Sequence, residues 1–292
     1  MPARYKIHSA LLLVGLIYGA NYTIAKVVMP AYVGPFGVIL IRVVTGSLLY
    51  WLFARLAGPE PIRYKRDYLR LAGLAVFGVA LNQLMFFKGL SMTSPISAAV
   101  IMTSSPITVL VVSYFLLHEK ITARKVAGIL LGATGAILLI GIDGYDFSNT
   151  TFLGNLFILI NATSYSLYLV LVKPLMMRYR PFTIIKWVFL FGTVYVLPFG
   201  IGEFSQVNWS AMPAHAWYAL AYVVVATTFI AYLLNVWSLQ YVNPTLVGYY
   251  IYLQPLFATL VAVVFRGDAL TVQEALYAAL IFAGVYLVSA GR

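Results

Sequence analysis

The sequence contains ten windows of about 20 mostly apolar residues, and these windows account for most of the chain. About 20 residues of helix are needed to cross a hydrocarbon core of about 30 Å. Within lipid every backbone polar group must be satisfied internally, which helices and closed barrels achieve, and windows this long without alternation do not suit barrel strands. The sequence therefore predicts an all-α integral membrane protein with ten transmembrane helices.

Composition supports this prediction. Only 9% of the residues are charged, 62% are hydrophobic and the mean hydropathy is +0.92, whereas about a quarter of the residues of a soluble domain are charged. The predicted spans are residues 8–29, 35–54, 69–90, 95–117, 122–142, 151–175, 182–202, 215–239, 244–265 and 271–290. They leave almost no chain for a soluble domain.

Basic residues alternate from one connection to the next. They precede the first window (Arg4, Lys6) and follow the second (Arg55, Arg63, Lys65, Arg66, Arg70), the fourth (Lys120, Arg124, Lys125) and the sixth (Lys173, Arg178, Arg180). The intervening connections 30–34, 91–94, 144–150 and 203–215 contain no Lys or Arg. By the positive-inside rule both termini are cytoplasmic, and the net charge of +11 indicates membrane topology rather than nucleic-acid binding. We expect a multi-pass protein of the cell membrane, such as a bacterial inner membrane.

Two pairs of prolines indicate an internal duplication. Pro95 and Pro106 recur as Pro244 and Pro255, 149 residues later, and residues 71–141 align without a gap on residues 220–290. The chain thus divides into repeats at 1–146 and 147–292, each with five helices. An odd number of helices makes the second repeat enter the membrane from the opposite side, as in many secondary transporters that work by alternating access. We expect Pro106 and Pro255 to lie halfway along their helices and to allow kinks there.

Several motifs resemble the EamA-type drug/metabolite transporters. They are "GANYTIAK" from Gly19, "PFGVILIRVV" with Arg42, "SSPITVLVVSYFLLHEKIT" with Glu119, "GILLGATGAILLI" with Gly128 and Gly135, and a second copy beginning "LQPLFATLVAVVFRGDALT" with Asp268. The resemblance covers the whole chain. It implies a ten-helix carrier of two inverted five-helix repeats, with a central cavity lined by the first, third, fourth, sixth, eighth and ninth helices. It also implies export of small metabolites, amino acids among them.

Polar and aromatic side chains at helical spacing identify candidate substrate-binding residues. Residues at i, i+4 and i+7 share one helix face, and amides are costly in contact with lipid, so these faces are predicted to point inward. The candidates are Tyr18, Asn21, Tyr22, Asn82, Gln83, Asn161, Tyr165, Tyr168, Thr228, Tyr232, Asn235, Tyr249, Tyr252 and Gln254. Together they predict an amphipathic cavity that accepts amino acids or similar compounds, including aromatic ones.

Charged residues within the spans are candidates for gating or charge roles, namely Lys26, Arg42 and Lys186, beside Pro106 and Pro255. No carboxylate falls in the middle of a span, since Glu119, Asp268 and Glu274 flank the helix ends. A proton-coupled exporter of multidrug cations would use such a buried acid. Uniport or exchange of neutral or zwitterionic solutes is therefore favoured.

Other classes of function remain as alternatives or are disfavoured. The three histidines lie outside the middle of any span, and neither a phosphate-binding loop nor a His-Glu motif is present, so we expect no enzyme activity, no cofactor and no metal. A channel or lipid scramblase, or a multidrug-cation exporter, is the open alternative. The expected partners are a small-molecule substrate and the lipid bilayer, with the protein a monomer or homodimer.

Overall fold

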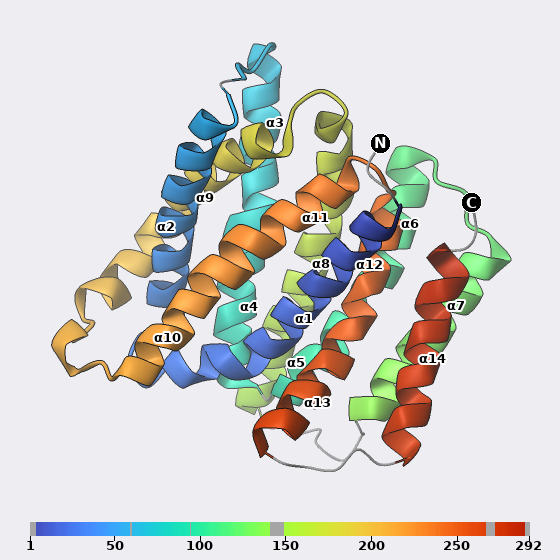
Figure 1. Cartoon of the computed structure of the whole chain (residues 1–292). Helices are drawn as coiled ribbons and strands as arrows, with labels where there is room; N and C mark the ends of the chain where they lie inside the picture. Colours follow the sequence, from blue (N-terminus) through green and yellow to red (C-terminus); the bar gives the residue numbers. More distant parts are fainter. Residues whose placement is uncertain (1–3, 59, 94, 141–148, 267–271, 290–292) are drawn as a thin grey trace.

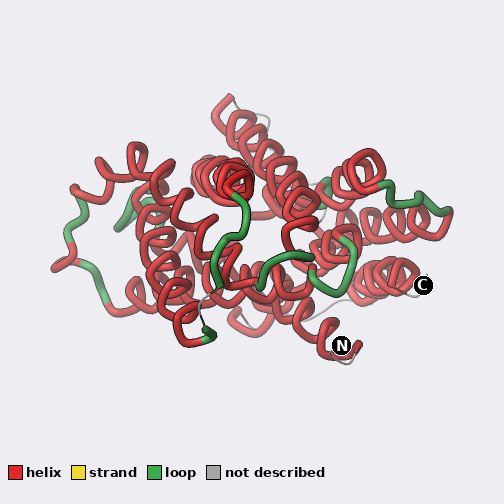
Figure 2. Tube along the Cα trace, turned by 90° about the horizontal axis from the view of Figure 1, so that it is seen from above, coloured by secondary structure: helices red, strands yellow, loops and turns green. Residues whose placement is uncertain are grey.

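The computed structural model describes residues 4–58, 60–93, 95–140, 149–266 and 272–289. Within these ranges every regular element is a helix, and Figure 2 shows the helices in red joined by green loops, with no yellow strand among the described residues. The first half contains α1 (Arg4–Val28), α2 (Pro35–Leu56), α3 (Lys65–Ala75), α4 (Leu81–Met92), α5 (Pro95–Met102), α6 (Ser105–Leu117) and α7 (Ala123–Ile140). The second half contains α8 (Asn149–Met176), α9 (Pro181–Ser205), α10 (Ala214–Tyr222), α11 (Ala231–Leu239), α12 (Pro244–Tyr249), α13 (Leu253–Arg266) and α14 (Val272–Ser289). The all-α prediction is confirmed for the described residues.

Two π-helical turns join short helices into longer rods. η1 (Val76–Ala80) connects α3 to α4, and η3 (Val223–Ile230) connects α10 to α11. With these turns included, six of the described helical segments are long and apolar enough to cross a membrane: Arg4–Val28, Pro35–Leu56, Lys65–Met92, Thr150–Met176, Pro181–Ser205 and Ala214–Leu239. Ser105–Leu117 and Ala279–Val288 are shorter apolar helices.

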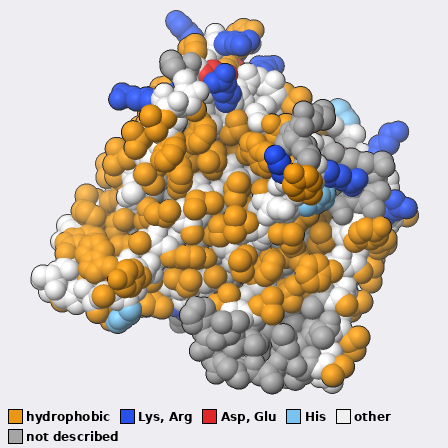
Figure 3. Space-filling model, viewed as in Figure 1, with side chains coloured by type: hydrophobic (Ala, Val, Ile, Leu, Met, Phe, Trp, Pro, Cys, Tyr) orange, Lys and Arg blue, Asp and Glu red, His pale blue; other side chains and the backbone are white. Residues whose placement is uncertain are grey.

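The surface of the protein exposes many hydrophobic side chains, as the surface of a membrane protein does where it faces lipid. In Figure 3 hydrophobic side chains cover the middle of the visible face, and Lys and Arg side chains gather at its upper and right-hand edges. Leucines such as Leu48, Leu56 and Leu130 expose more than half of their surface. An exposed apolar area of this extent is unfavourable in water, so it indicates a lipid-facing belt.

Pro106 and Pro255 lie in the first turns of helices and do not kink continuous helices. The helix ends at Met102 and restarts at Ser105, which places Pro106 in the first turn of α6. A short 3₁₀ turn at Tyr250–Tyr252 separates α12 from α13, and Pro255 is the third residue of α13. The first turn has no intrahelical partner for its N–H groups, so proline costs no hydrogen bond there. The prediction that Pro106 and Pro255 lie halfway along continuous helices is therefore wrong, because each helix is interrupted just before its proline.

Four helix pairs make the main contacts: α2 with α9, α7 with α14, α4 with α8, and α1 with α13. Figure 1 shows α7 and α14 side by side at one edge of the molecule. Glycines bring α7 and α14 together, because a Cβ on Gly284 would lie 2.7 Å from the Gly128 carbonyl oxygen and 2.7 Å from the Gly132 nitrogen. The helix backbones therefore touch at this point, as small residues allow in membrane helices.

We expect Gly284→Ala to lower the thermal unfolding temperature of the purified protein, because the new methyl group meets backbone atoms that cannot rotate away. Overpacking of this kind costs about 1–3 kcal/mol. Gly73→Ala is the matched control, since a Cβ there has nothing within 4 Å and alanine favours the helix by about 0.5–1 kcal/mol. Equal unfolding temperatures for the two variants would contradict the close packing of α7 on α14.

Candidate functional site

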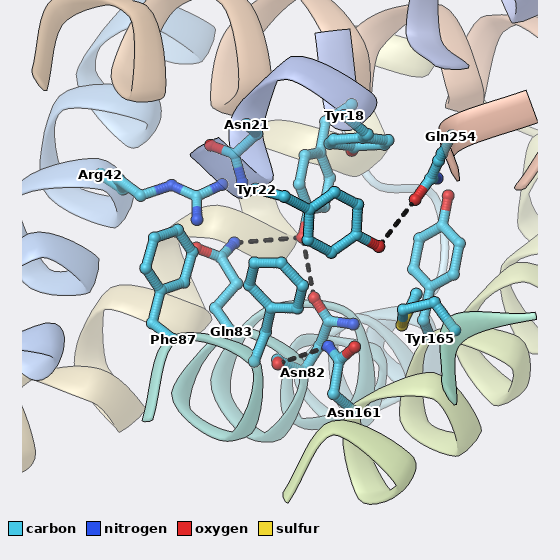
Figure 4. A pocket seen from close by; sticks show the side chains of 13 residues that line it. Tyr18, Asn21, Tyr22, Arg42, Asn82, Gln83, Phe87, Asn161, Tyr165 and Gln254 are labelled. Carbon is cyan, nitrogen blue, oxygen red and sulfur yellow. Dashed lines mark hydrogen bonds between the residues drawn. The ribbon is translucent and has the colours of Figure 1, made fainter. Parts of the chain in front are cut away.

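A polar cavity lies among the helices at the centre of the molecule. Figure 4 shows the side chains of the 13 residues that line it: Tyr18, Asn21, Tyr22, Arg42, Asn82, Gln83, Phe86, Phe87, Met102, Asn161, Tyr165, Tyr232 and Gln254. They come from α1, α2, α4, α5, α8, α11 and α13. The cavity volume is about 60 Å³, well below the roughly 300 Å³ at which small-molecule pockets begin.

A hydrogen-bond network fixes one wall of the cavity around Tyr232. The Tyr232 hydroxyl lies 2.9 Å from the Gly78 carbonyl oxygen and 3.2 Å from Asn82 Oδ1, and it accepts a hydrogen bond from Gln83 Nε2 at 3.1 Å. Its single proton serves one of the two acceptors at a time. Asn161 Nδ2 donates to the Asn82 carbonyl oxygen at 2.7 Å. These contacts hold α4, α8 and α11 in register.

The π turn η1 explains why the hydroxyls of Tyr232 and Ser164 approach the backbone next to the cavity. A π turn disturbs the regular backbone ladder, and buried carbonyls then need other donors. Tyr232 approaches the Gly78 carbonyl, and Ser164 Oγ donates to the Phe77 carbonyl at 2.7 Å. The turn is therefore satisfied by side chains of the second half of the chain.

Three amide oxygens that line the cavity have no hydrogen-bond partner among the described residues. They are Asn21 Oδ1, Gln83 Oε1 and Asn161 Oδ1. For Gln83 and Asn161 the bonds made by the amide nitrogens fix which end of each amide is the acceptor. A buried acceptor without a donor costs about 1–3 kcal/mol. The cavity thus offers acceptors suited to a ligand that carries N–H donors.

Arg42 supplies a positive charge to the same cavity. Its side chain is 3% exposed, its Nε donates to Thr228 Oγ1 at 2.7 Å and its Nη2 donates to Thr227 Oγ1 at 3.2 Å. Both threonine hydroxyls donate to the Val223 carbonyl oxygen, so their oxygens are free to accept. The guanidinium also lies 4.5 Å from the centroid of the Phe87 ring.

The charge of Arg42 is therefore held by neutral groups. None of the 13 lining residues is an aspartate or glutamate, and Arg42 makes no salt bridge within the described residues. Two of its five N–H donors bind threonines. An anionic group in the cavity would pair with the remaining donors.

Nine of the candidate substrate-binding residues line this cavity, and five do not. Tyr168 packs against Gly78, Tyr252 packs against Gly132, and the Tyr249 hydroxyl donates to the Lys125 carbonyl at 3.0 Å. The other two lie behind the lining: Thr228 holds Arg42, and Asn235 Nδ2 donates to the Tyr165 hydroxyl at 2.9 Å. These five side chains therefore contact glycines, the Lys125 carbonyl or the lining residues themselves, and none of them lines the cavity.

The other charged candidates lie away from the cavity. Lys26 Nζ donates to the Thr93 carbonyl oxygen at 2.9 Å, just after the end of α4. Lys186 lies 4.8 Å from the centroid of the Trp51 ring. Of the three cationic candidates, Arg42 alone is a lining residue.

Phe86, Phe87 and Met102 line the cavity although the sequence analysis did not select them. Phe86 and Phe87 follow Asn82 and Gln83 by four residues and so share their helix face. That spacing was a usable signal, but apolar residues within an apolar helix do not stand out by composition. Met102 is the last residue of α5, and its placement depends on the helix break that follows it.

The described residues thus form a helical protein with an apolar, lipid-facing surface and a charged polar cavity at its centre, as expected of a membrane protein that binds a polar solute. The chain belongs to the EamA-like transporter family, whose model matches residues 6–141 and again residues 152–290. This finding confirms the resemblance seen in the sequence and the expectation of a multi-pass membrane transporter.

Two curated relatives are similar to this chain over most of its length. An uncharacterized transporter of Archaeoglobus fulgidus is 26% identical over 290 residues, which cover 98% of each chain. A chloroplastic WAT1-related protein of Arabidopsis thaliana is 26% identical over 93% of this chain and 66% of its own length. Among the solved structures that match, a crystal structure has a TM-score of 0.79 over 99% of this chain and 98% of that chain; at 19% identity it supports the fold alone.

We expect Tyr232→Phe to lower the unfolding temperature, because it leaves the Gly78 carbonyl and the amides of Asn82 and Gln83 without the shared hydroxyl. A buried polar group without its partner costs about 1–3 kcal/mol. Tyr218→Phe is the control, since Tyr218 is 76% exposed. If both variants unfold at the wild-type temperature, the network around Tyr232 does not stabilise the protein.

Proposed function

We propose that the protein is a carrier that exports small metabolites bearing a carboxylate, amino acids or similar amphipathic compounds, across the cell membrane. The observation that carries this proposal is Arg42, a buried cation that lines the central cavity and is held only by hydroxyls and an aromatic ring. A lone buried charge is unfavourable until a charge of opposite sign joins it. A substrate carboxylate is the group of that kind a metabolite would bring.

The acceptor atoms favour a substrate that also carries an ammonium or amide group. Asn21, Gln83 and Asn161 each present an unpaired oxygen to the cavity, so an ammonium group would find acceptors there while the carboxylate binds Arg42. Phe86, Phe87 and Tyr22 supply aromatic surface for an apolar portion of the substrate. This combination fits a zwitterionic amino acid with a large or aromatic side chain.

The small size of the cavity and the internal repeat both support transport by alternating access. A volume of about 60 Å³ does not admit a metabolite unless the surrounding helices move apart. The π turn η1, shifted by 149 residues, falls within η3. Gln83 and Tyr232, which are also 149 residues apart, hydrogen-bond to each other. These relations support two inverted repeats, 1–146 and 147–292, that rock about a shared axis.

We further propose ten membrane crossings with both termini in the cytoplasm. Joining α3 to α4, α5 to α6, α10 to α11 and α12 to α13 gives five rods in each half. The alternation of basic connections sets their direction. A bacterial inner membrane is the expected location.

Two alternative functions make different demands on the site. A multidrug-cation exporter would be opposed by Arg42, because a like charge within a cavity of low dielectric repels its substrate. A channel or scramblase would conduct without saturation.

Counterflow in proteoliposomes separates these classes: vesicles are loaded with an unlabelled amino acid or other metabolite, and uptake of a labelled one is recorded. Saturable exchange supports the carrier, and flux without saturation or trans-stimulation supports a pore.

In that assay we expect Arg42→Met to reduce exchange of carboxylate-bearing solutes by about 10- to 100-fold, since hydrogen bonds to a charged group contribute about 1.5–3 kcal/mol. Arg42→Lys should recover little, because lysine lacks the planar fork. The unfolding temperature of Arg42→Met should be unchanged or higher, since an unpaired buried charge is removed.

Lys186→Met is the matched control, because Lys186 is also a buried cation but lies over Trp51 and outside the cavity. We expect it to keep wild-type exchange. Exchange that is lost equally in the Lys186 and Arg42 variants, or retained in both, would remove Arg42 as the substrate's partner.

A further inference from the structure

A second pocket lies at the end of the molecule where α3 begins, away from the central cavity. It is lined by Arg63, Tyr64, Arg66, Asp67, Arg70, Met177, Arg178 and Tyr179 and has a volume of about 710 Å³. These residues come from the α2–α3 connection, the first turns of α3 and the α8–α9 connection. In Figure 3 basic side chains gather at this end. We refer to it as the arginine pocket.

One buried carboxylate organises the arginine pocket. Asp67 is 1% exposed, and its Oδ1 accepts a hydrogen bond from Arg70 Nη1 at 3.0 Å. Its Oδ2 accepts one from the Tyr179 hydroxyl at 2.8 Å and lies 3.7 Å from Arg178 Nη1. The Tyr179 oxygen in turn accepts from the Arg63 backbone N–H at 3.1 Å. The two connections are therefore tied together through Asp67.

This arrangement also fixes the protonation of the phenol. Burial, followed by the hydrogen bond to Asp67, raises the pKa of Tyr179, so the hydroxyl keeps its proton and donates it to the carboxylate. Asp67 is thus surrounded by donors. Its charge offsets one of the cations that line the pocket.

The pocket keeps a strong positive charge after this pairing. Four arginines and one aspartate give a net charge of +3. Arg63 and Arg66 make no salt bridge within the described residues, and the paired Arg70 and Arg178 side chains remain 56% and 49% exposed. The nearby Glu60 accepts a hydrogen bond from the Arg180 backbone N–H at 2.8 Å. Guanidinium groups gathered in this way suit phosphate oxygens.

The segments that carry these arginines also expose apolar side chains. Met177, which lines the pocket, is 71% exposed, and Leu69, which precedes Arg70, is 76% exposed. A free phosphate compound would gain nothing from them, whereas an acyl chain would. We propose that the arginine pocket binds the headgroup phosphate of an anionic phospholipid, whose chains lie along this apolar surface, at the membrane face proposed to be cytoplasmic.

The test is native mass spectrometry of the intact protein in detergent, titrated with phosphatidylglycerol and, separately, with phosphatidylcholine. We expect retention of phosphatidylglycerol in preference to phosphatidylcholine. Each arginine near a membrane surface contributes about fivefold to anionic lipid binding, so the double variant Arg63→Gln, Arg66→Gln should bind phosphatidylglycerol about 25-fold more weakly. Neither side chain has a hydrogen bond or ion pair within the described residues, so we expect the variant to fold, which gel filtration checks.

Lys120→Gln with Arg124→Gln is the control, because it removes the same charge from another basic segment, the α6–α7 connection and the first turn of α7. We expect phosphatidylglycerol binding to persist in it. Equal loss in both double variants would overturn the proposal in favour of nonspecific attraction. Complete displacement of the lipid by equimolar glycerol phosphate would also overturn it, because the apolar surface would then contribute nothing. None of these readouts depends on transport.

Discussion

The interaction on which the central cavity depends is the clasp of Arg42 by two threonines. An unpaired guanidinium inside a membrane protein must be held by dipoles, and here the carbonyl of Val223 takes both threonine protons so that both hydroxyl oxygens face the charge. Thr227 and Thr228 are adjacent residues within the π turn η3. The departure from regular helix at η3 thus places two neighbouring hydroxyls on one guanidinium, and it brings a residue of α2 into a cavity formed largely by other helices.

The second π turn is satisfied in the same way. The π turn η1 exposes the carbonyls of Phe77 and Gly78. Ser164 of α8 and Tyr232 of α11 hydrogen-bond to these carbonyls. Irregular backbone at membrane depth is tolerated only where protein groups or a cavity satisfy it. Both π turns therefore lie next to the cavity, whereas the regular helices α7 and α14 pack on each other through glycine contacts at the edge of the molecule.

The sequence was sufficient for the helical class, because long uncharged apolar windows admit few other structures. It also identified Asn21, Gln83 and Asn161, because an amide in an apolar helix is costly unless it faces inward. It misplaced Pro106 and Pro255, since a proline in an apolar run marks a kink or a helix start equally well, and only the neighbouring backbone decides. Tyr168 was assigned to the cavity by its helical spacing and Tyr252 by its place in a tyrosine-rich span, but neither signal identifies the glycine that packs against each ring.

The cavity is asymmetric although the chain is proposed to be duplicated. Aligning the first residues of α2 and α9, Pro35 and Pro181, puts Val188 opposite Arg42, so one repeat alone supplies the charge. Gln83 and Tyr232 occupy matching positions yet differ in chemistry, one as donor and the other as acceptor in the bond between them. A site with its cation near α2 and its free acceptors on α1, α4 and α8 distinguishes the two ends of a ligand. Duplication can supply the hinge, but only divergence of the two halves can orient an asymmetric substrate within it.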